Sequence, residues 1–428
     1  MMDPSMRMMR AGVRSIIHLL ALTVLAAAPI AAPAQAPVTT IAITGGTLID
    51  GTGKPPVSNT TIVVRGDRIV AVGPSGSVDI PAGATRYSAA GKYILPGFMD
   101  LHVHLVYPPS AAEPSHSLST LRGLYFMEKF VDAGVTSVRD VGGMVEPMQA
   151  LDEAQRLGYI HSLRLHAVGQ LITTTGGHGP SWSYFANGPY GFREAVRKMD
   201  EAGFHYIKIS PPFTQEEADA AADEARIRRM HITSHGGGYS DTEPPSMTRR
   251  AVLAGVQCIE HLYMNVEDLD LIAQRGIHIV PTMEVSKLLY DYPTVIPQIQ
   301  YLRDKRGWSM AFHDSLFREA NKRHIVMGVG TDAVLDFMEK NYPDMYFAEM
   351  EHFVRLGMTR LEAISAASKN GAVILGREAE LGTLEKGKLA DLQVVDGNPL
   401  ESFKPLGHPS LVMIGGAVRR LSGQRLQN

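Results

Sequence analysis

The sequence predicts an α/β fold, a (β/α)8 TIM-type barrel with a small β-sandwich module that both chain ends build together. Three observations lead to this prediction. The chain has 428 residues, which suits a barrel of about 250 residues plus an accessory module. In its middle, eight short apolar runs alternate with longer stretches of helical composition. Short β-like runs separated by turn residues occupy both flanks of that middle part.

The middle of the chain supplies the eight predicted barrel strands. They are residues 97–104, 135–140, 163–169, 206–210, 230–235, 258–262, 277–283 and 325–332. The segments between them, such as 216–229 and 265–275, have helical composition, and strands that alternate with helices indicate parallel βαβ units. An open doubly wound sheet is the structural alternative. No Gly-x-Gly-x-x-Gly turn follows the first strand, which argues against a dinucleotide-binding version of that sheet.

The two flanks have the sequence pattern of a small β-module. Gly, Asp, Asn and Pro separate their β-rich runs, which are residues 41–43, 61–64, 68–72, 392–395 and 410–414. The same pattern at both chain ends predicts that the two ends build one module together. The expected boundaries are 37–93 for its N-terminal part, 94–378 for the barrel and 379–428 for its C-terminal part.

Residues 1–36 have the layout of a secretory signal peptide. Arg7, Arg10 and Arg14 precede an apolar run over 16–28, and small residues follow up to Ala36. The candidate cleavage sites follow Ala34 and Ala36. The apolar run is short for a membrane span, although an uncleaved anchor is the alternative. This leader predicts an exported bacterial protein, periplasmic or secreted.

Composition excludes several other classes. The net charge is −3 and the sequence pI is about 6.6, so the basic footprint of a nucleic-acid-binding protein is absent. The single cysteine, Cys258, cannot form an internal disulfide. No stretch after the leader is apolar enough to span a bilayer. We therefore expect no nucleic-acid partner and no stable membrane span after processing.

Two histidines at the end of the first predicted strand form a candidate metal-binding pair. They are His102 and His104 in the segment DLHVH, 100–104. Side chains on a strand alternate faces with a period of two, so both imidazoles point to the same side. Two adjacent imidazoles suit a divalent transition metal. The pair alone is weak evidence, because structural histidines with this spacing are common.

Four further candidate ligands lie on other predicted strands, near their carboxyl ends. They are Lys208, His235, His261 and Asp332. Catalytic residues of β/α barrels come from the C-terminal ends of several strands. A lysine inside a barrel is costly without a partner, unless it extends out of the strand end. Carboxylation by carbon dioxide would instead turn the Lys208 amine into an anion able to bridge two metals.

The set His-x-His, Lys, His, His, Asp resembles the binuclear amidohydrolase superfamily. The segments ILPGFMD (94–100) and GTLEKGKLADL (382–392) resemble it too. GVTSVRDVGG (134–143) and TGGHG (175–179) resemble the branch of imidazolonepropionase-like proteins, Xaa-Pro dipeptidase-like carboxypeptidases and ochratoxin-hydrolysing amidohydrolases. The resemblance covers nearly everything after residue 40. Within this branch, the chain looks most like the bacterial ochratoxin-degrading amidohydrolases.

The resemblance implies two divalent metal ions. The ligands would divide as follows: His102, His104 and Asp332 on one ion, His235 and His261 on the other, and a carboxylated Lys208 bridging both. Two such ions lower the pKa of a shared water towards neutrality. The Asp332 carboxylate would accept the water's proton and pass it to the leaving amine. Zinc is the expected metal, with manganese, cobalt and iron as alternatives.

One departure from the family pattern follows the fifth predicted strand. The segment after His235, GGGYSD over 236–241, is longer and richer in glycine than the branch leads us to expect. His231 lies four residues earlier and shares strand parity with His235. We prefer His235 as the ligand, because ligands sit at strand ends, and we assign His231 to packing.

Two residues match positions that contact substrate in related enzymes, according to the resemblance. They are His178, on a glycine-flanked turn after the third strand, and Tyr263, just after His261. The alternatives are a solvent-exposed loop histidine and a packed tyrosine. Aromatic residues after His178 would line an apolar substrate pocket or a subunit interface: Trp182, Tyr184, Phe185 and Tyr190.

The resemblance implies hydrolysis of an exocyclic amide with release of a C-terminal amino acid. This carboxypeptidase-like or dipeptidase-like activity includes cleavage of ochratoxin A to ochratoxin alpha and phenylalanine. Alternatives are cyclic-amide hydrolysis, esterase, lactonase or phosphotriesterase chemistry, and a non-catalytic binding protein. The complete ligand set argues against the last. The expected partners are a small amide or dipeptide substrate and further copies of the chain in a homo-oligomer.

Overall fold

The computed structural model describes residues 39–107, 115–179, 182–237, 243–291, 308–333 and 342–426. The predicted signal peptide lies outside these residues, as does part of the glycine-rich segment after His235. Residues from Thr39 onwards form one compact unit. Among the helices of the described ranges, none combines the length and the apolar character needed to cross a membrane.

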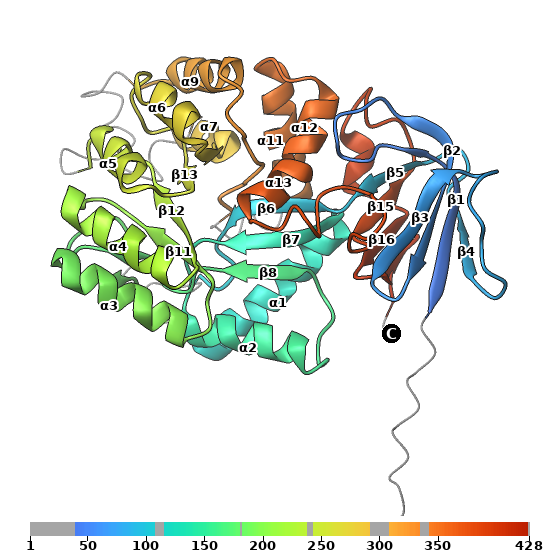
Figure 1. Ribbon diagram of the computed structural model, residues 1–428, viewed down its shortest axis with the longest axis horizontal. Helices are drawn as coiled ribbons and strands as arrows, with labels where there is room; N and C mark the ends of the chain where they lie inside the picture. The colour runs from blue at the N-terminus through green and yellow to red at the C-terminus, as the bar shows by residue number, and fades with distance from the viewer. Residues whose placement is uncertain are drawn as a thin grey trace, which may run out of the picture. The chain divides into compact units, whose positions relative to one another are not determined.

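The predicted barrel strands form in chain order, and their ladders are parallel (Figure 1). They are β6 (Phe98–Val103), β7 (Val135–Asp140), β8 (Arg164–Ala167), β11 (Tyr206–Ile209), β12 (His231–His235), β13 (Cys258–Glu260) and β14 (His278–Val280). The eighth predicted strand, 325–332, is reduced to isolated parallel bridges. Met327 pairs with Ile279 and Ala333 with Val103, so this segment connects β14 to β6.

The third predicted strand divides into two parts, which leaves a seam between β8 and β11. β8 pairs with β7, whereas the short β9 (Ile172–Thr173) pairs with β11 and with β10 (Tyr184–Phe185). Within the described ranges, no ladder joins β8 to β11. The predicted α/β class, with parallel strands and covering helices, is confirmed. Closure of the ring into a complete barrel stays a prediction.

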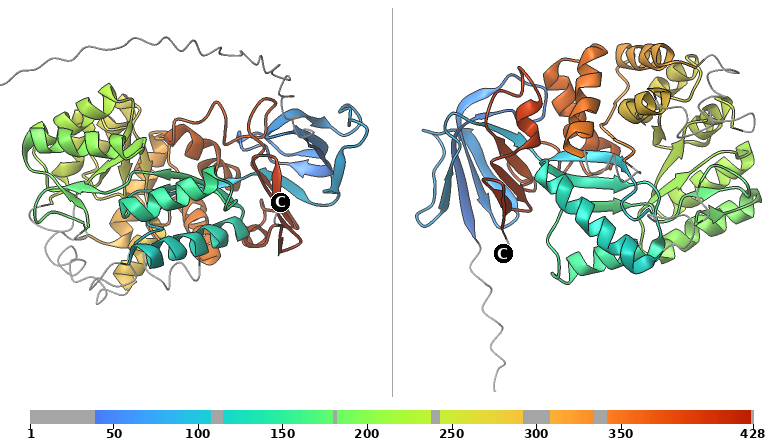
Figure 2. Two further views of the ribbon diagram at one scale, coloured as in Figure 1. Left: turned by 90° about the horizontal axis from the view of Figure 1, so that it is seen from below. Right: turned by 180° about the vertical axis from the view of Figure 1, so that it is seen from behind.

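Helices follow the strands and cover them from outside (Figure 2). They are α1 (His116–Asp132), α2 (Val145–Arg156), α3 (Gly188–Glu201), α4 (Gln215–Ile227), α5 (Ser246–Ala254), α6 (Asp268–Arg275), α7 (Met283–Asp291), α9 (Met310–Lys322), α11 (Tyr342–Arg355), α12 (Arg360–Ala366) and α13 (Lys369–Ile374). α4 begins at a capping box between Thr214 and Glu217 and buries an alanine-rich face. One large apolar core joins these helices to the strands.

The two chain ends build one further sheet of nine strands. Its strands are β1 (Thr40–Leu48), β2 (Val57–Arg65), β3 (Arg68–Pro74), β4 (Thr85–Ser88), β5 (Tyr93–Pro96), β15 (Leu392–Val395), β16 (Leu411–Ile414), β17 (Ala417–Leu421) and β18 (Gln424–Arg425). A short 3-10 helix, Lys404–Gly407, precedes β16. The ladders connect all nine strands, where the predicted β-sandwich would have two separate sheets. These strands enclose a second apolar core of their own.

A bend in β1 explains why one sheet replaces two. The first half of β1 pairs with β4 and the second half with β5. The bend lies at Gly45, whose φ is +80°, and Gly46. A Cβ on Gly46 would lie 2.7 Å from a side-chain carbon of Ile94 on β5. The absence of a side chain therefore lets β1 cross from one partner strand to the other.

Gly97 joins this sheet to the first barrel strand. Its N–H donates to the Asp391 carbonyl at 2.9 Å, and Asp391 also accepts two hydrogen bonds from Arg164 on β8. A Cβ on Gly97 would lie 2.2 Å from Oγ1 of the buried Thr136 on β7. The junction that places β6, and with it His102, has no room for a side chain.

We expect Gly97→Ala to lower the free energy of unfolding by about 1–3 kcal/mol, because the added methyl overpacks a closed site. The measurement is urea unfolding followed by circular dichroism. Gly76→Ala is the matched control, since nothing lies within 4 Å of a Cβ there. Equal unfolding midpoints for the two variants would contradict the prediction.

Candidate metal centre

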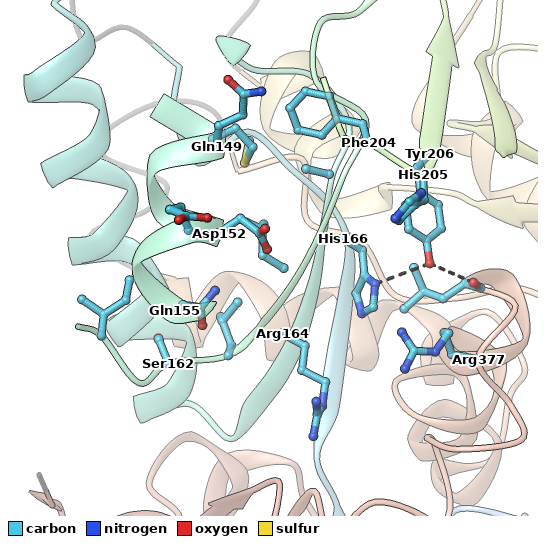
Figure 3. Close-up of a pocket in the computed structure, with 18 of the residues that line it drawn as sticks. Gln149, Asp152, Gln155, Ser162, Arg164, His166, Phe204, His205, Tyr206 and Arg377 are labelled. Atoms are coloured by element: carbon cyan, nitrogen blue, oxygen red, sulfur yellow. Dashed lines mark hydrogen bonds between the residues drawn. The ribbon is translucent and has the colours of Figure 1, made fainter. Parts of the chain in front are cut away.

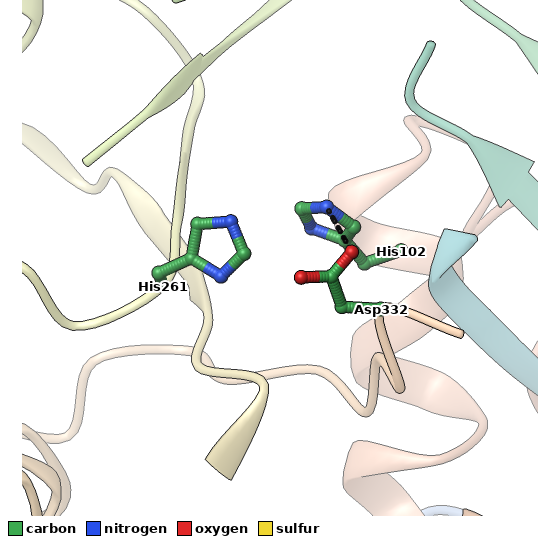
Figure 4. A group of neighbouring side chains, drawn as sticks. All are labelled: His102, His261 and Asp332. Carbon is green, nitrogen blue, oxygen red and sulfur yellow. Dashed lines mark ion pairs between the residues drawn. The ribbon is translucent and has the colours of Figure 1, made fainter. Parts of the chain in front are cut away.

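The end of β6 and the end of the eighth predicted strand bring three candidate ligands together. Oδ1 of Asp332 lies 3.5 Å from Nε2 of His102 and 3.4 Å from Nε2 of His104. The backbone aligns them, because the Asp332 N–H donates to the His102 carbonyl at 2.7 Å. Figure 4 shows the Asp332 carboxylate between the rings of His102 and His261.

The other predicted histidines lie at the same place. The ring of His261 is 4.7 Å from that of His102 and 4.4 Å from that of His235, centre to centre. The His178 ring stacks on His235 at 4.2 Å. His261 and His235 are 2% exposed and His102 is fully buried. The carboxyl ends of β6, β12 and β13 thus gather a continuous group of imidazoles.

Lys208 completes the predicted set from β11. Its side chain is 3% exposed, and its Nζ lies 3.2 Å from Nε2 of His102. Burial lowers the pKa of this amine, although the carboxylates of Glu260 and Asp332 act in the opposite direction. The structure therefore brings together Lys208 and the other five residues predicted to bind metal.

Three of the imidazoles are oriented by a hydrogen bond at Nδ1. The partners are the Glu260 carboxylate for His102, the Gly142 carbonyl for His104 and the Thr282 hydroxyl for His261, at 2.8, 2.7 and 2.6 Å. A bond at Nδ1 fixes the ring and leaves Nε2 as the free ligand atom, which is the usual arrangement around protein-bound metals. The three Nε2 atoms are thereby presented to one region.

The Glu260 carboxylate is the centre of a fully buried ion network. Its Oε1 accepts from Arg139 Nη2 at 2.5 Å and from the Thr233 hydroxyl, and its Oε2 faces His102. Arg139 also donates through Nε to the Leu101 carbonyl at 2.7 Å. Burial alone would raise the pKa of Glu260, but the guanidinium and the bond to His102 hold it below its usual range. Glu260 is therefore an anion that orients His102.

Two ligand candidates have an unusual backbone conformation. His261 has φ +68° and Asp332 has φ +52°, and Thr282, which bonds His261, has φ +48°. Non-glycine residues in the left-handed region are uncommon and cost free energy, so they persist where the surroundings impose them. Here the strands end abruptly and turn the two side chains inward.

Helix α11 fixes the backbone around β6. The Tyr342 hydroxyl donates to Oδ2 of Asp100 at 2.8 Å, and the Thr331 hydroxyl donates to the same oxygen at 2.7 Å. Oδ1 of Asp100 accepts the N–H of His102 and that of Thr331. Burial raises the pKa of Asp100 to about 6 despite these bonds. One buried carboxylate thus ties α11 to the two segments that carry His102 and Asp332.

The same helix also fixes the segment around His261. Glu349 lies seven residues after Tyr342, on the same helix face, and is fully buried. Its two oxygens accept the N–H groups of Met283 and Glu284 at 2.9 and 2.6 Å, at the start of α7. The residue before Met283 is Thr282, which bonds the His261 ring. Burial raises the pKa of Glu349 to about 8.

The residues present fit a divalent metal. The ligand atoms of His102, His261 and Asp332 lie within 4.8 Å of one another, close to the spacing of donors around one ion with bonds of about 2.0–2.2 Å. Burial, with the Lys208 charge, lowers the pKa of His102 to about 4, so the ring is neutral, as a ligand must be. This compact group contains predicted ligands of both metal ions.

The predicted substrate contacts fall into two groups. Nδ1 of His178, which is about one-third exposed, lies 3.9 Å from Oε2 of Glu243. Tyr263, in contrast, is 1% exposed, and its ring lies 5.5 Å from His261 and 5.6 Å from Trp308. His178 borders the centre, whereas Tyr263 packs behind it.

The aromatic residues after His178 do not act as one surface. Trp182 lies edge-on to Tyr107, whose ring is 6.3 Å from His104. Phe185 and Tyr190 are 42% and 89% exposed, and Tyr184 contacts Lys198. Of these residues, only Trp182 connects to the metal centre by ring contacts, through Tyr107. His231 stacks on Tyr206 at the opposite end of β12.

Sequence reasoning missed the residues that support the ligands. These are Asp100, Tyr107, Arg139, Glu243, Glu260, Thr282, Tyr342 and Glu349. A charged residue in a buried strand was the available signal for Arg139 and Glu260. No sequence pattern marks Tyr342 or Glu349, because their partners are distant in the chain.

Glu349→Gln tests the α11 contact through the pH dependence of stability. A pKa raised from 4.5 to about 8 means that the folded chain retains a proton which the unfolded chain releases. The stabilisation is complete below pH 4.5 and is lost as the pH rises through 8. We therefore expect the unfolding free energy of the parent, relative to that of the variant, to fall between about pH 5 and 8.

The measurement is urea unfolding of both proteins across that pH range. Nearby Glu284 and Asp100 also raise the pKa of Glu349, and both remain in the variant, so the difference isolates Glu349. A difference in unfolding free energy that stays constant with pH would contradict the prediction.

Comparison with known proteins gives the family. Ochratoxinase from Aspergillus niger is 27% identical over 431 residues, covering 86% of this chain and 84% of that protein. Imidazolonepropionase from Symbiobacterium thermophilum is 25% identical over 404 residues, covering 84% and 88%. The solved structure of a Xaa-Pro dipeptidase with bound methionine in the active site is 28% identical, with a TM-score of 0.78, covering 89% and 100%.

These relatives confirm the branch that the motifs predicted, although this ochratoxinase is fungal and the pattern had suggested bacterial ones. The family model described as "Amidohydrolase family" matches residues 93–419, which is most of the chain. The prediction of a metal-dependent amide hydrolase is confirmed, and the alternative of a non-catalytic barrel is wrong. The chain belongs to the amidohydrolase family.

Proposed function

We propose that this chain is a binuclear metallohydrolase that cleaves an exocyclic amide and releases a C-terminal amino acid. The observation that carries the proposal is the grouping of four buried or partly buried histidines, Asp332 and Lys208 at adjoining strand ends. Similarity to a Xaa-Pro dipeptidase and to ochratoxinase supports an exocyclic amide. Ochratoxin A, cleaved to ochratoxin alpha and phenylalanine, is the proposed test substrate.

The proposed centre holds two divalent ions, with zinc as the preferred metal. Its ligands are His102, His104 and Asp332 on one ion and His235 and His261 on the other. Ions bound there would supply Lewis acidity, which activates water and polarises an amide carbonyl. The chain supplies the rest: oriented Nε2 atoms, a dry setting and a group that moves protons.

Lys208 is the proposed bridge between the ions, as a carbamate. An ammonium 3.2 Å from Nε2 of His102 would repel any cation that the ring binds. A neutral amine that reacts with carbon dioxide gains a carboxylate and loses that repulsion. The nearly complete burial of Lys208 protects such a carbamate from water. The Arg139 guanidinium is already engaged by Glu260, so it does not compete for the new anion.

Asp332 is the proposed general base and then general acid. Its Oδ1 lies 3.4 Å from Nε2 of His104, and its side chain is partly exposed, with 17% accessible. It therefore faces both the ligands and the side from which substrate enters, and can carry a proton from water to the leaving amine. His178, stacked on His235, is placed to donate a hydrogen bond to the developing oxyanion.

The wall formed by Tyr107 and Trp182 is the proposed apolar side of the substrate pocket. Their rings meet edge-on at 5.4 Å next to His104. An aromatic wall of this kind favours substrates with an apolar or aromatic side chain. For Tyr263, full burial favours support of the His261 ring over direct contact with substrate.

Cyclic-amide hydrolysis is the second candidate function. The similarity to imidazolonepropionase over most of both chains favours it. Lys208 favours the exocyclic reaction, because a bridging carbamate serves a two-ion centre. Esterase and lactonase activities use the same polarised carbonyl and belong to the same test.

Export and self-association complete the proposal. The leader over residues 1–36 supports export, and its cleavage would be measured by N-terminal sequencing of the protein recovered outside the cytoplasm. A homo-oligomer would be detected by light scattering of the purified mature chain. An intact leader on the exported protein, or a monomer at micromolar concentration, would contradict these two parts.

The central test is amino-acid release from ochratoxin A, dipeptides and N-acyl amino acids by the metal-replete chain. We expect Lys208→Ala to lower kcat/KM by at least about a hundredfold, since the bridge and the orientation of both ions are lost together. Lys198→Ala, at an exposed position on α3, is the matched control and keeps full activity. Hydrolysis of cyclic amides or esters alone would favour the second candidate.

Metal stoichiometry tests the binuclear centre separately. We expect a chelator to abolish hydrolysis and added zinc to restore it. Elemental analysis would give two ions per chain for the parent, and His235→Ala would retain one, because the ligands of the other ion remain. Full activity of the chelated chain, or one ion per parent chain, would contradict the proposed centre.

A further inference from the structure

A cavity lies at the other end of the strands that carry the metal centre. It has a volume of ≈1010 Å³ and lies where β8 and β11 separate. Its lining includes Arg164, Tyr206 and His231, which begin β8, β11 and β12. The metal centre is at the carboxyl ends of these strands, so the two sites lie on opposite faces. We call this cavity the seam cleft.

A histidine with an unused acceptor forms the floor of the seam cleft. The Tyr206 hydroxyl donates its one proton to the Leu375 carbonyl at 3.0 Å. Nδ1 of His166 lies 3.4 Å from the same hydroxyl oxygen and therefore donates a hydrogen bond to it (Figure 3). Burial lowers the pKa of His166 to about 3, so the ring is neutral and Nε2 is a bare acceptor. The side chain is 7% exposed, and in the described part of the chain Nε2 has no hydrogen-bond partner.

One wall of the seam cleft carries arginines. Arg164 and Arg377 are held by Asp391 and Glu380 through Nε and Nη2, and neither Nη1 has a hydrogen-bond partner in the part of the chain that the structure describes. Arg419, on β17, is half-buried, and its buried Nε has no hydrogen-bond partner among the described residues. Burial lowers the pKa of Arg419. The Glu128 carboxylate acts on this charge from nearby, but a buried donor without a hydrogen-bond partner is costly, so Arg419 favours an anion in the cleft.

The opposite wall carries the exposed carboxylate of Asp152. Figure 3 shows Asp152 and Gln155 of α2 facing His166, Arg164 and Arg377 across the cleft. Glu153 is paired with Arg156, whereas Asp152 has no ion-pair partner among the described residues. Cationic and anionic side chains thus line opposite sides of one cavity, and no ion pair among the described residues joins them across it.

We propose that the seam cleft binds a zwitterionic amino acid or dipeptide. The guanidinium of Arg419 would hold the carboxylate, with the free Nη1 groups of Arg164 and Arg377 beside it. Asp152 would hold the ammonium, and a shift of the side chains around His166 would let its buried Nε2 accept an N–H of the ligand. A simple anion such as phosphate satisfies the arginines but meets repulsion from Asp152. The cavity has more than enough room for a ligand of this size.

The test is isothermal titration of the metal-replete chain with L-phenylalanine, beside phosphate and phenylpropionate, which lacks the amino group. We expect a binding site outside the metal centre that Arg419→Gln and Asp152→Asn each weaken at least tenfold. Both variants would keep the parent's rate of amide hydrolysis, measured without added ligand. Arg226→Gln, on the exposed face of α4, is the matched control. Urea unfolding would show that each variant folds.

Three results would overturn the proposal. The first is amino-acid binding that neither variant alters, which would place all binding at the metal centre. The second is phosphate binding as tight as that of the amino acids and tightened by Asp152→Asn, which would indicate a plain anion site. The third is no binding of any probe at millimolar concentration. Absence of hydrolysis by the parent would refute the proposed function but not the proposed binding site, because the seam cleft is tested by binding and not by activity.

Discussion

The buried contact between Glu260 and Arg139 is the constraint on which the metal centre depends. Four histidines and a lysine gather in a largely buried space, and such a group needs a fixed negative partner. Glu260 supplies it, because Arg139 holds the carboxylate ionised while its second oxygen orients His102. Removing either charged side chain would leave the charge of the other buried without a partner. The orientation of His102 therefore depends on an ion pair between two residues that are not among the proposed metal ligands.

Helix α11 imposes the second constraint. Tyr342 and Glu349 lie on one face of it and contact two separate segments of the centre, through Asp100 and through the start of α7. These contacts explain how left-handed conformations at His261 and Asp332 persist. Backbone strain is retained where the surroundings determine it more strongly than local preference does. The helix thus holds in position the segments that carry these ligands.

The sequence predicted the local parts of this arrangement and missed the distant ones. Strand periodicity and strand ends are local properties, so His102, His261 and Asp332 could be placed on one rim from the sequence alone. Glu260 and Arg139 are 121 residues apart, and Tyr342 is 242 residues from Asp100. Pairings of this length leave no periodic trace. The bend of β1 at Gly46 was missed for the same reason, because the strand it must cross to was unknown.

The division of the third barrel strand explains why one fold presents two sites. Gly169, with φ +72°, turns the chain between β8 and β9, and a Cβ there would lie 2.6 Å from the Phe204 ring. The part before the turn stays with β7 and leaves the seam cleft open beside β11. The part after it pairs with β11 and leads into the loop that carries His178 to His235. A continuous strand would close the cleft and carry the loop elsewhere. Gly169 therefore affects both the metal centre and the seam cleft, although it belongs to neither group of binding residues.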